Sequence, residues 1–171
     1  MPTKNESVTG QNLQSHDSIY QTHPAQRAKI SMVATPIGNL GDITQRAIHV
    51  IENCDELWCE DTRHTQNLLN ALHINKDHHR LKRFDQHTTE SDLHRLLERV
   101  QEQGQWIGVV TDAGVPGISD PGAKIVENIY QYPEIKIEAI PGASAVSSMV
   151  SIAGYQDNSF KFQGFFPRER K

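Results

Sequence analysis

Three loops of this 171-residue chain combine glycine, proline and polar side chains in a way that suits ligand binding. Residues 35–42 read TPIGNLGD, residues 111–122 read TDAGVPGISDPG and residues 140–145 read IPGASA. Each loop follows an expected strand and precedes an expected helix, and its glycines and prolines allow close backbone approach and fix the path. One such loop is ordinarily only a tight connection, but three in one sheet favour a shared ligand site.

A fourth segment, residues 60–65, places two acids, an arginine and a histidine where a strand gives way to a helix. In a functional interpretation, Arg63 binds a phosphate or carboxylate group of a substrate. In a structural interpretation, Asp61 or Thr62 caps the helix and Arg63 pairs with an acid. The residues themselves leave both interpretations open.

Other familiar chemistries lack their patterns. Neither G-x-G-x-x-G nor a P-loop sequence occurs, and Ser144 lacks the second glycine of a nucleophile elbow. Cys54 and Cys59 are too few for a zinc site or a disulfide scaffold, and we expect one at a helix end and one in a strand. Five histidines crowd residues 73–94 without metal-ligand spacing, so we predict solvated histidines and no metal.

The elements that position these loops alternate along the chain. Strands are expected at 30–34, 56–59, 81–84, 107–111 and 135–140. Helices are expected after Asp42 as cap, around 68–72, from Thr89 to Gly104, after Asp120-Pro121, and after Pro141-Gly142 with Val146, Met149 and Val150 facing inward. This order predicts an α/β, Rossmann-like fold with a mostly parallel five-stranded sheet and helices on both faces. Ligands bind outside the carboxyl ends of such strands.

Composition bounds the remaining possibilities. Seventeen basic against 21 acidic residues give a net charge of −4, which argues against wrapping nucleic acid by bulk charge. No apolar run is long enough to span a bilayer, and residues 1–14 lack the core of a secretory signal, so we expect a cytoplasmic protein without membrane or DNA partners. Residues 1–28 are polar and aperiodic, which predicts a disordered tail. Residues 29–158 form the α/β domain, and 159–171, with a strand-like stretch from Phe160 to Phe166, begin a second one.

Taken in order, the motifs resemble one family. They are VATPIGNLGD at 33–42, EDTRHT at 60–65, DAG at 112–114, SDPG at 119–122, IPG at 140–142 and GFFP at 164–167. This series is similar to that of ribosomal RNA small subunit methyltransferase I, in the tetrapyrrole methylase-like superfamily. The resemblance implies transfer of a methyl group from S-adenosylmethionine to the 2′-hydroxyl of a cytidine ribose in 16S rRNA of the 30S subunit, in the decoding region. It also implies a two-domain homodimer, of which this chain is the N-terminal domain.

The resemblance also implies roles for the matching positions. The cofactor-binding positions are Pro36, Leu40, Gly41, Asp112, Ala113, Gly114, Val115, Pro141, Gly142, Ser144 and Ala145. The free N–H groups at the helix that Ser144 and Ala145 open suit a carboxylate. Among catalytic positions, Asp61 or Asp112 is a candidate general base, and Arg63 a candidate for holding RNA phosphate.

Two further hypotheses stay open. One is a methylase acting on a small molecule such as a tetrapyrrole precursor. The motif at residues 60–65 favours the rRNA-modifying members of the family over this alternative. The other is a non-catalytic cofactor-binding module, because half of the cleft is absent from this chain. For the same reason we expect the chain alone to be inactive.

Overall fold

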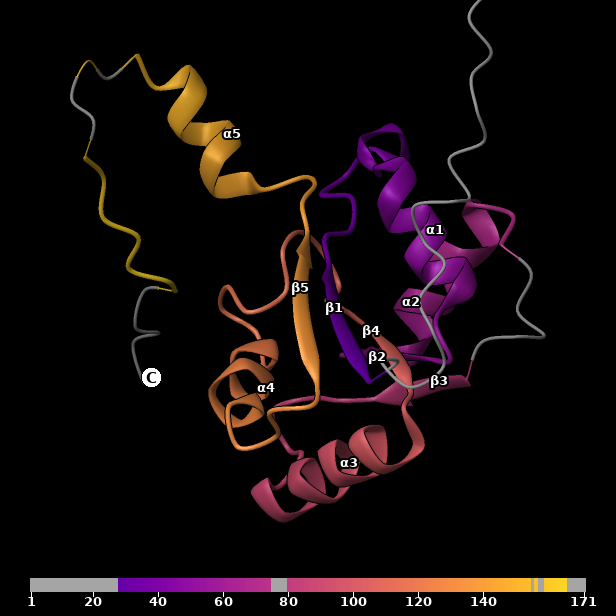
Figure 1. Ribbon diagram of the computed structural model, residues 1–171. Coiled ribbons are helices and arrows are strands. Elements are labelled where there is room, and N and C mark those ends of the chain that lie inside the picture. Colours follow the sequence, from indigo (N-terminus) through magenta and orange to yellow (C-terminus); the bar gives the residue numbers. More distant parts are fainter. Residues whose placement is uncertain (1–27, 75–79, 155, 157–158, 166–171) are drawn as a thin grey trace, which may run out of the picture.

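A five-stranded parallel sheet organises the chain, as the alternating pattern predicted (Figure 1). The computed structural model describes residues 28–74, 80–154, 156 and 159–165. The strands are β1 (Lys29–Val33), β2 (Glu56–Cys59), β3 (Arg80–Arg83), β4 (Trp106–Val110) and β5 (Lys136–Ile140). Their order is β3-β2-β4-β1-β5, and all four neighbouring pairs are parallel. The carboxyl ends of the strands therefore lie at one edge of the sheet.

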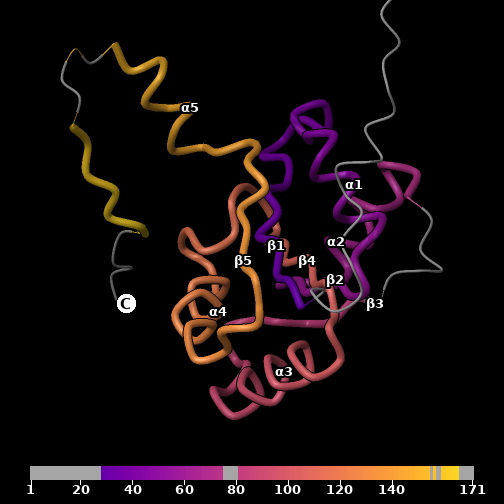
Figure 2. Tube along the Cα trace, in the orientation of Figure 1, coloured from indigo at the N-terminus to yellow at the C-terminus, as the bar shows by residue number. Residues whose placement is uncertain are grey.

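Two pairs of helices cover the two faces of this sheet (Figures 1 and 2). Helices α1 (Gln45–Asn53) and α2 (Thr62–Ala71) bury one core cluster, which includes Val33, Leu57 and Leu69. Helices α3 (Glu90–Gln103) and α4 (Gly122–Ile129) bury the other, which includes Ile30 and Trp58. Because a strand's side chains alternate between faces, β1, β2 and β4 each contribute residues to both cores. The expected α/β fold with helices on both faces is thus confirmed.

Capping residues set the helix starts, and one predicted cap is wrong. The cap of α1 is Thr44, whose hydroxyl accepts a hydrogen bond from the Ala47 amide at 3.1 Å. Asp42, the predicted cap, instead belongs to a short 3-10 helix, Leu40–Asp42, so the loop before α1 is longer than expected. Thr89 caps α3, and Gly104 ends it in the left-handed conformation at φ 59°, both as predicted.

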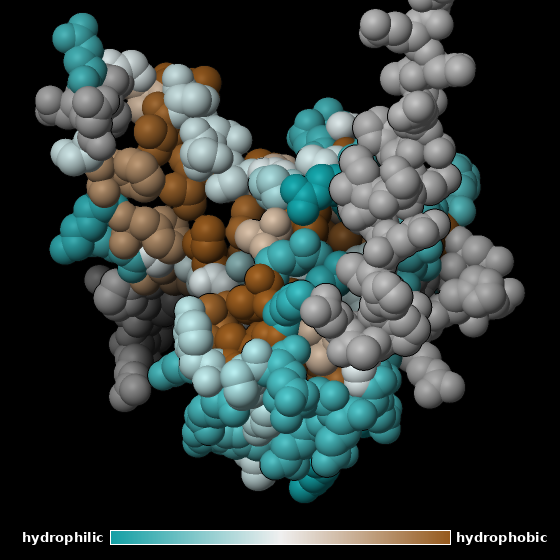
Figure 3. Space-filling view, viewed as in Figure 1, coloured by the Kyte–Doolittle hydropathy of each residue, from teal (hydrophilic) through white to brown (hydrophobic). Residues whose placement is uncertain are grey.

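The last described helix departs from the predicted packing. Helix α5 (Ala145–Ile152) projects from the carboxyl end of β5 and has no buried residue (Figures 1 and 3). Met149 is 63% exposed and Val150 38%, so the expectation that they and Val146 face a core is wrong. An apolar helix face becomes interior only where another element packs on it, and among the described residues none covers α5 in this way.

The ends of the chain follow the predictions only in part. The residues described from Ser159 to Phe165 form no strand, against the strand expected over Phe160 to Phe166, and Phe166 lies outside the described residues. Residues 1–27 of the predicted tail also lie outside them, whereas Ala28, the tail's predicted last residue, is buried in the core at 6% exposure.

A buried ion pair anchors the amino end of β2. The Arg99 guanidinium of α3 donates to both carboxylate oxygens of Glu56, at 2.8 and 2.7 Å, and the Trp58 indole donates to the same carboxylate at 3.0 Å. Burial alone would raise the pKa of Glu56, but Arg99 and Trp58 outweigh it and hold the pKa below its ordinary value. This glutamate is therefore part of the structural frame.

Candidate functional site

The first two predicted loops are joined directly at the carboxyl edge of the sheet. Thr35 and Gly114 exchange backbone hydrogen bonds of 2.9 and 3.1 Å in an isolated antiparallel bridge. The buried Thr35 hydroxyl also donates to the Thr111 carbonyl at 3.1 Å. Gly114 has φ +86°, a region that side chains other than glycine rarely adopt. The backbones of the two loops are thereby held as one surface.

The third loop packs against the first. The Ala34 amide donates to the Ile140 carbonyl at 3.2 Å, and the Thr44 hydroxyl donates to the Pro141 carbonyl at 3.4 Å. A Cβ added to Gly142 would lie 2.9 Å from the Ala34 Cβ, so the two loops approach as closely as glycine permits. The structure therefore brings together the three loops that sequence reasoning grouped.

Asp120 shapes the long loop after β4, a role that sequence reasoning missed. Its carboxylate accepts hydrogen bonds from the amides of Gly117, Ile118 and Gly122 at 2.8–3.1 Å. This arrangement turns the chain into α4, which begins at Gly122 beside the predicted Asp120-Pro121 start. The signal was present in the sequence, because an aspartate before Pro-Gly favours a turn in which its side chain binds nearby amides.

The predicted cofactor positions lie in the loops that follow β1, β4 and β5, up to the first residue of α5. Leu40 is 46% exposed and Ser144 caps α5, accepting from the Ser147 amide at 3.5 Å. The exposed positions are Leu40, Gly41, Ala113, Pro141, Gly142 and Ala145; the half-buried ones are Pro36, Asp112, Val115 and Ser144; Gly114 is buried. Most of these positions are therefore at least partly exposed, above the buried Gly114.

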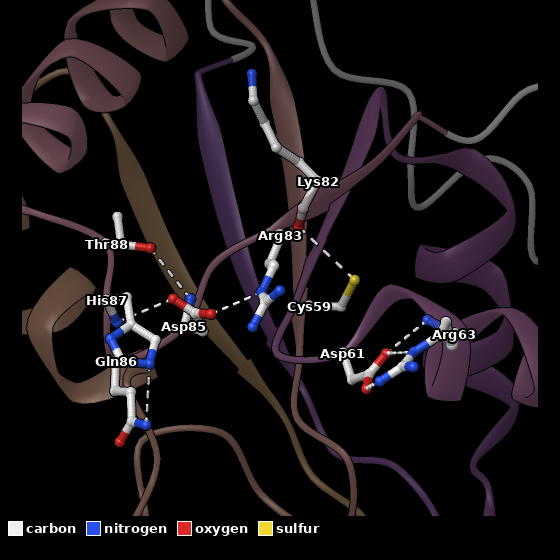
Figure 4. Close-up of polar contacts among 9 residues, drawn as sticks. All are labelled: Cys59, Asp61, Arg63, Lys82, Arg83, Asp85, Gln86, His87 and Thr88. Atoms are coloured by element: carbon white, nitrogen blue, oxygen red, sulfur yellow. Dashed lines mark hydrogen bonds and ion pairs between the residues drawn. The ribbon is translucent and has the colours of Figure 1, made fainter.

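The Asp61 and Arg63 side chains are occupied with each other (Figure 4). Asp61 caps α2 by accepting from the Arg63 amide at 2.8 Å, and the Arg63 guanidinium donates back to the same carboxylate at 2.8 and 3.2 Å. These bonds hold the pKa of Asp61 far below its ordinary value. This is the arrangement of the structural interpretation, although the Arg63 side chain stays 89% exposed.

Glu60, one residue earlier, differs from Asp61 because its surroundings raise the pKa of its carboxyl. It lines a small open pocket, with room for about one water molecule, at the carboxyl ends of β2 and β4, together with Thr111 and Asp120. The Thr111 hydroxyl donates to its carboxylate at 3.3 Å. Desolvation first, and then the negative charges of Asp112, Asp120 and Asp85, raise the pKa of Glu60 above its ordinary value.

The neighbouring Asp112 and Asp85 differ in how their charges are compensated. Asp112 Oδ1 is buried and, within the described part of the chain, accepts no hydrogen bond. Asp85 accepts from the Arg83 guanidinium at 2.6 Å and from the His87 amide at 2.9 Å (Figure 4). Burial alone would raise the pKa of Asp85, but these bonds outweigh it and lower the pKa.

The cysteines and histidines add no second site among the described residues. Cys54 caps the end of α1 and Cys59 ends β2, as predicted, and burial raises the pKa of both thiols, that of Cys54 to about 12. Between residues 28 and 165, outside the gaps, no group of three His, Cys, Asp or Glu side chains could hold a metal ion. In the same described residues, no helix is long and apolar enough to cross a membrane.

Comparison with known proteins shows which family the chain belongs to. The family model of tetrapyrrole (corrin/porphyrin) methylases matches residues 29–163, which include all four loops. The chain belongs to this family, and the resemblance seen in its motifs is confirmed.

Within this family, the chain is most clearly compared with individual relatives that share a name. The chain is 39% identical over 140 residues to ribosomal RNA small subunit methyltransferase I of Thermotoga maritima, covering 82% of this chain and 61% of the relative. It is 43% identical over 140 residues to the protein of that name from Pasteurella multocida, covering 82% and 48%. The chain therefore spans about half the length of the curated relatives it matches.

Solved structures share the fold. One is uroporphyrin-III-C-methyltransferase from Thermus thermophilus, with a TM-score of 0.54 and 20% identity over 74% of this chain and 52% of that one. Another is cobalt precorrin-4 methyltransferase, a cobalamin biosynthetic enzyme, with a TM-score of 0.55 and 17% identity over 78% and 53%. At these identities the likeness concerns the fold.

Proposed function

We propose that this chain is the N-terminal domain of an S-adenosylmethionine-dependent methyltransferase that modifies a cytidine 2′-hydroxyl of 16S rRNA within the 30S subunit. The observation that carries the proposal is the joining of the three family loops at one edge, with the EDTRHT segment beside them. The relatives that share this series of motifs at about 40% identity bear the name of an rRNA methyltransferase.

The loops fit a cofactor with a carboxylate and a flat ring system. The close approach at Gly142 and the positive φ of Gly114 let the three loops pack against one another as a single surface. Leu40 and Val115 would contact apolar parts of the cofactor, and the amides that open α5 beyond Ser144 would receive its carboxylate. When bound, S-adenosylmethionine supplies an activated methyl group on a positively charged sulfur.

The charged loops after β2 and β3 would meet the acceptor. Methyl transfer depends mainly on positioning and electrostatics, so groups near the attacking oxygen matter most. Arg63, oriented by Asp61 yet 89% exposed, is placed to receive an RNA phosphate. Asp61 itself is a poor candidate for the base, because its lowered pKa makes it a weak proton acceptor.

The remaining features of the whole protein are part of the same proposal. A second domain that starts near Ser159 completes the cofactor cleft, two such proteins form a homodimer, and the enzyme works in the cytoplasm. The exposed α5 and the exposed Phe160 and Phe162 support this, since apolar surface of this kind is suited to cover by further protein (Figure 3). The chain alone would then bind cofactor weakly and transfer no methyl group.

A small-molecule acceptor is the second candidate function. It is favoured by the fold shared with methyltransferases whose names refer to tetrapyrrole-type compounds. The two candidates differ in their acceptor and agree on the cofactor and on the loops that bind it.

The experiment uses an extended protein, meaning this chain followed by the second domain that family members carry. It is incubated with methyl-labelled S-adenosylmethionine and either 30S subunits or a porphyrinoid. We expect label in 16S rRNA, recovered after nuclease digestion as 2′-O-methylcytidine. Label in the porphyrinoid but not in rRNA would establish the alternative, and label in neither would leave a cofactor-binding module.

A further inference from the structure

Glu60 lies where an acceptor hydroxyl and the cofactor loops would meet. It lines the small pocket at the ends of β2 and β4 together with Trp58 and Phe84, whose rings are stacked. Thr111 connects this pocket to the cofactor loops, because its hydroxyl donates to Glu60 and its carbonyl accepts from the Thr35 hydroxyl. One residue thus separates Glu60 from the Thr35–Gly114 bridge.

Three nearby carboxylates are already engaged by other groups. Asp61 binds the Arg63 guanidinium and amide, and Asp85 binds the Arg83 guanidinium and the His87 amide. Asp120 accepts from three loop amides. Within the described residues, the carboxylate of Glu60 receives only the long hydrogen bond from Thr111. Asp112, whose Oδ1 also lacks a partner among the described residues, does not line this pocket. Of the two carboxylates that line it, Asp120 and Glu60, Glu60 is therefore the one with capacity to accept a proton.

We propose that Glu60 is a catalytic residue that accepts the proton of the attacking 2′-hydroxyl. This assignment rests on the proposed function. The ribose oxygen forms a bond to the methyl carbon while the bond from that carbon to sulfur breaks. The electron pair of the broken bond stays on sulfur, which becomes a neutral thioether, and the hydroxyl proton moves to the Glu60 carboxylate. Atoms and charge balance without another reactant.

The surroundings of Glu60 suit a base. Desolvation raises its pKa most, and Asp112 and Asp120 on the loop after β4 and Asp85 on the loop after β3 raise the pKa further. The cations of the surrounding elements are directed elsewhere: Arg63 to Asp61, Arg83 to Asp85, and Lys124 of α4 to the Gln86 carbonyl at 3.5 Å. A carboxylate with a raised pKa is a stronger base once it is ionised.

Kinetics in the extended protein test the proposal. Glu60→Gln should lower kcat by about 100-fold or more, the ordinary contribution of general base catalysis, while KM and cofactor affinity stay within about twofold. Glu60→Asp, which withdraws the carboxylate by one methylene, should fall between parent and Gln variant. The parent's kcat should rise with pH through the pKa of Glu60. Glu102→Gln removes the same charge from an exposed position on α3 and should leave kcat unchanged.

A second readout needs no methyl transfer. In this chain with ¹³C-labelled glutamate, the Glu60 carboxyl, assigned by its loss in Glu60→Gln, should titrate above the ordinary range, and Asp112→Asn should lower its pKa. An ordinary or lowered pKa, or full kcat in Glu60→Gln, would overturn the role of Glu60 while leaving the proposed function intact. A parent enzyme that labels no rRNA would overturn the proposed function itself, and this assignment with it.

Discussion

Strand β2 has a glutamate at each end, and the protein treats the two in opposite ways. Glu56, at the first residue of the strand, is bound by Arg99 and Trp58, and its side chain is 6% exposed. Glu60, just past the last residue, receives one hydrogen bond from Thr111 and faces three acids. Folding compensates the first charge and leaves the second uncompensated. A perturbed group of the second kind, beside a pocket, is typical of a functional site.

The largest predicted effect comes from breaking the ion pair of Glu56 with Arg99. Arg99→Met would leave the Glu56 carboxylate buried without its guanidinium, which should lower the free energy of unfolding by about 3–5 kcal/mol at neutral pH. Urea denaturation of this chain measures it. The matched control is Arg95→Met on the same helix, whose pair with Asp92 is 78% and 51% exposed and should be worth at most about 1 kcal/mol. Equal losses in the two variants would contradict a structural role for Glu56.

The effect of Arg99→Met should depend on pH in a defined direction. Because the pKa of Glu56 is lowered in the fold, its contribution to stability is present above the ordinary glutamate pKa and is lost as pH falls through the lowered value. The parent and Arg99→Met should therefore converge in unfolding free energy toward acid pH. A difference that widens on acidification would mean that the ion pair is not the cause.

An intermediate effect concerns the packed base of the cofactor loops. Gly142→Val would bring side-chain atoms against Ala34, 2.9 Å from the first added carbon, and overpacking of this kind costs about 1–3 kcal/mol. If the loops move apart to relieve it, cofactor affinity of the extended protein should fall by about tenfold or more, equivalent to about 1.4 kcal/mol. Calorimetry measures the affinity, and the thermal midpoint shows that the variant is folded. Unchanged cofactor affinity would contradict a role for the packing at Gly142 in cofactor binding.

The smallest predicted effect is on the stability of the protein when the charge of Glu60 is removed. A carboxyl with a raised pKa weakens the fold as pH rises through that pKa, so removing its charge should stabilise the protein at neutral pH. Glu60→Gln should therefore be slightly more stable than the parent at about pH 8, by less than about 1 kcal/mol because the side chain is partly solvated, and no more stable at about pH 4. Parallel urea denaturation at both values checks this. Destabilisation at the higher pH would show that the ionised Glu60 supports the fold.

Local sequence signals predicted the sheet and the grouping of the loops, because short apolar or alternating stretches recur between helical patterns, and loops with glycine and proline follow β1, β4 and β5. They failed where the outcome depends on distant residues. Asp42 and Thr44 are both good caps, and the position of the 3-10 helix decides between them. Met149 and Val150 look interior by composition, yet burial requires an element to pack on them.

The candidate site shows the same limit more sharply. Glu60 and Asp61 are adjacent acids, and nothing local predicts that one borders a pocket while the other turns out to Arg63. That difference follows from the strand ending at Cys59 and the helix starting at Thr62, which aim successive side chains in different directions. The motif could therefore be recognised from sequence, while the roles within it required the fold.

The most direct test of this division of the molecule is a map of cofactor contacts. The ¹⁵N-labelled chain is titrated with S-adenosylmethionine, and amide shifts are followed residue by residue. Binding should be weak, with the largest shifts in residues 35–42, 112–115 and 141–145 and unmoved signals for Glu56 and Arg99 at the opposite edge. Largest shifts at the amino ends of the strands, with the three loops unaffected, would contradict this prediction.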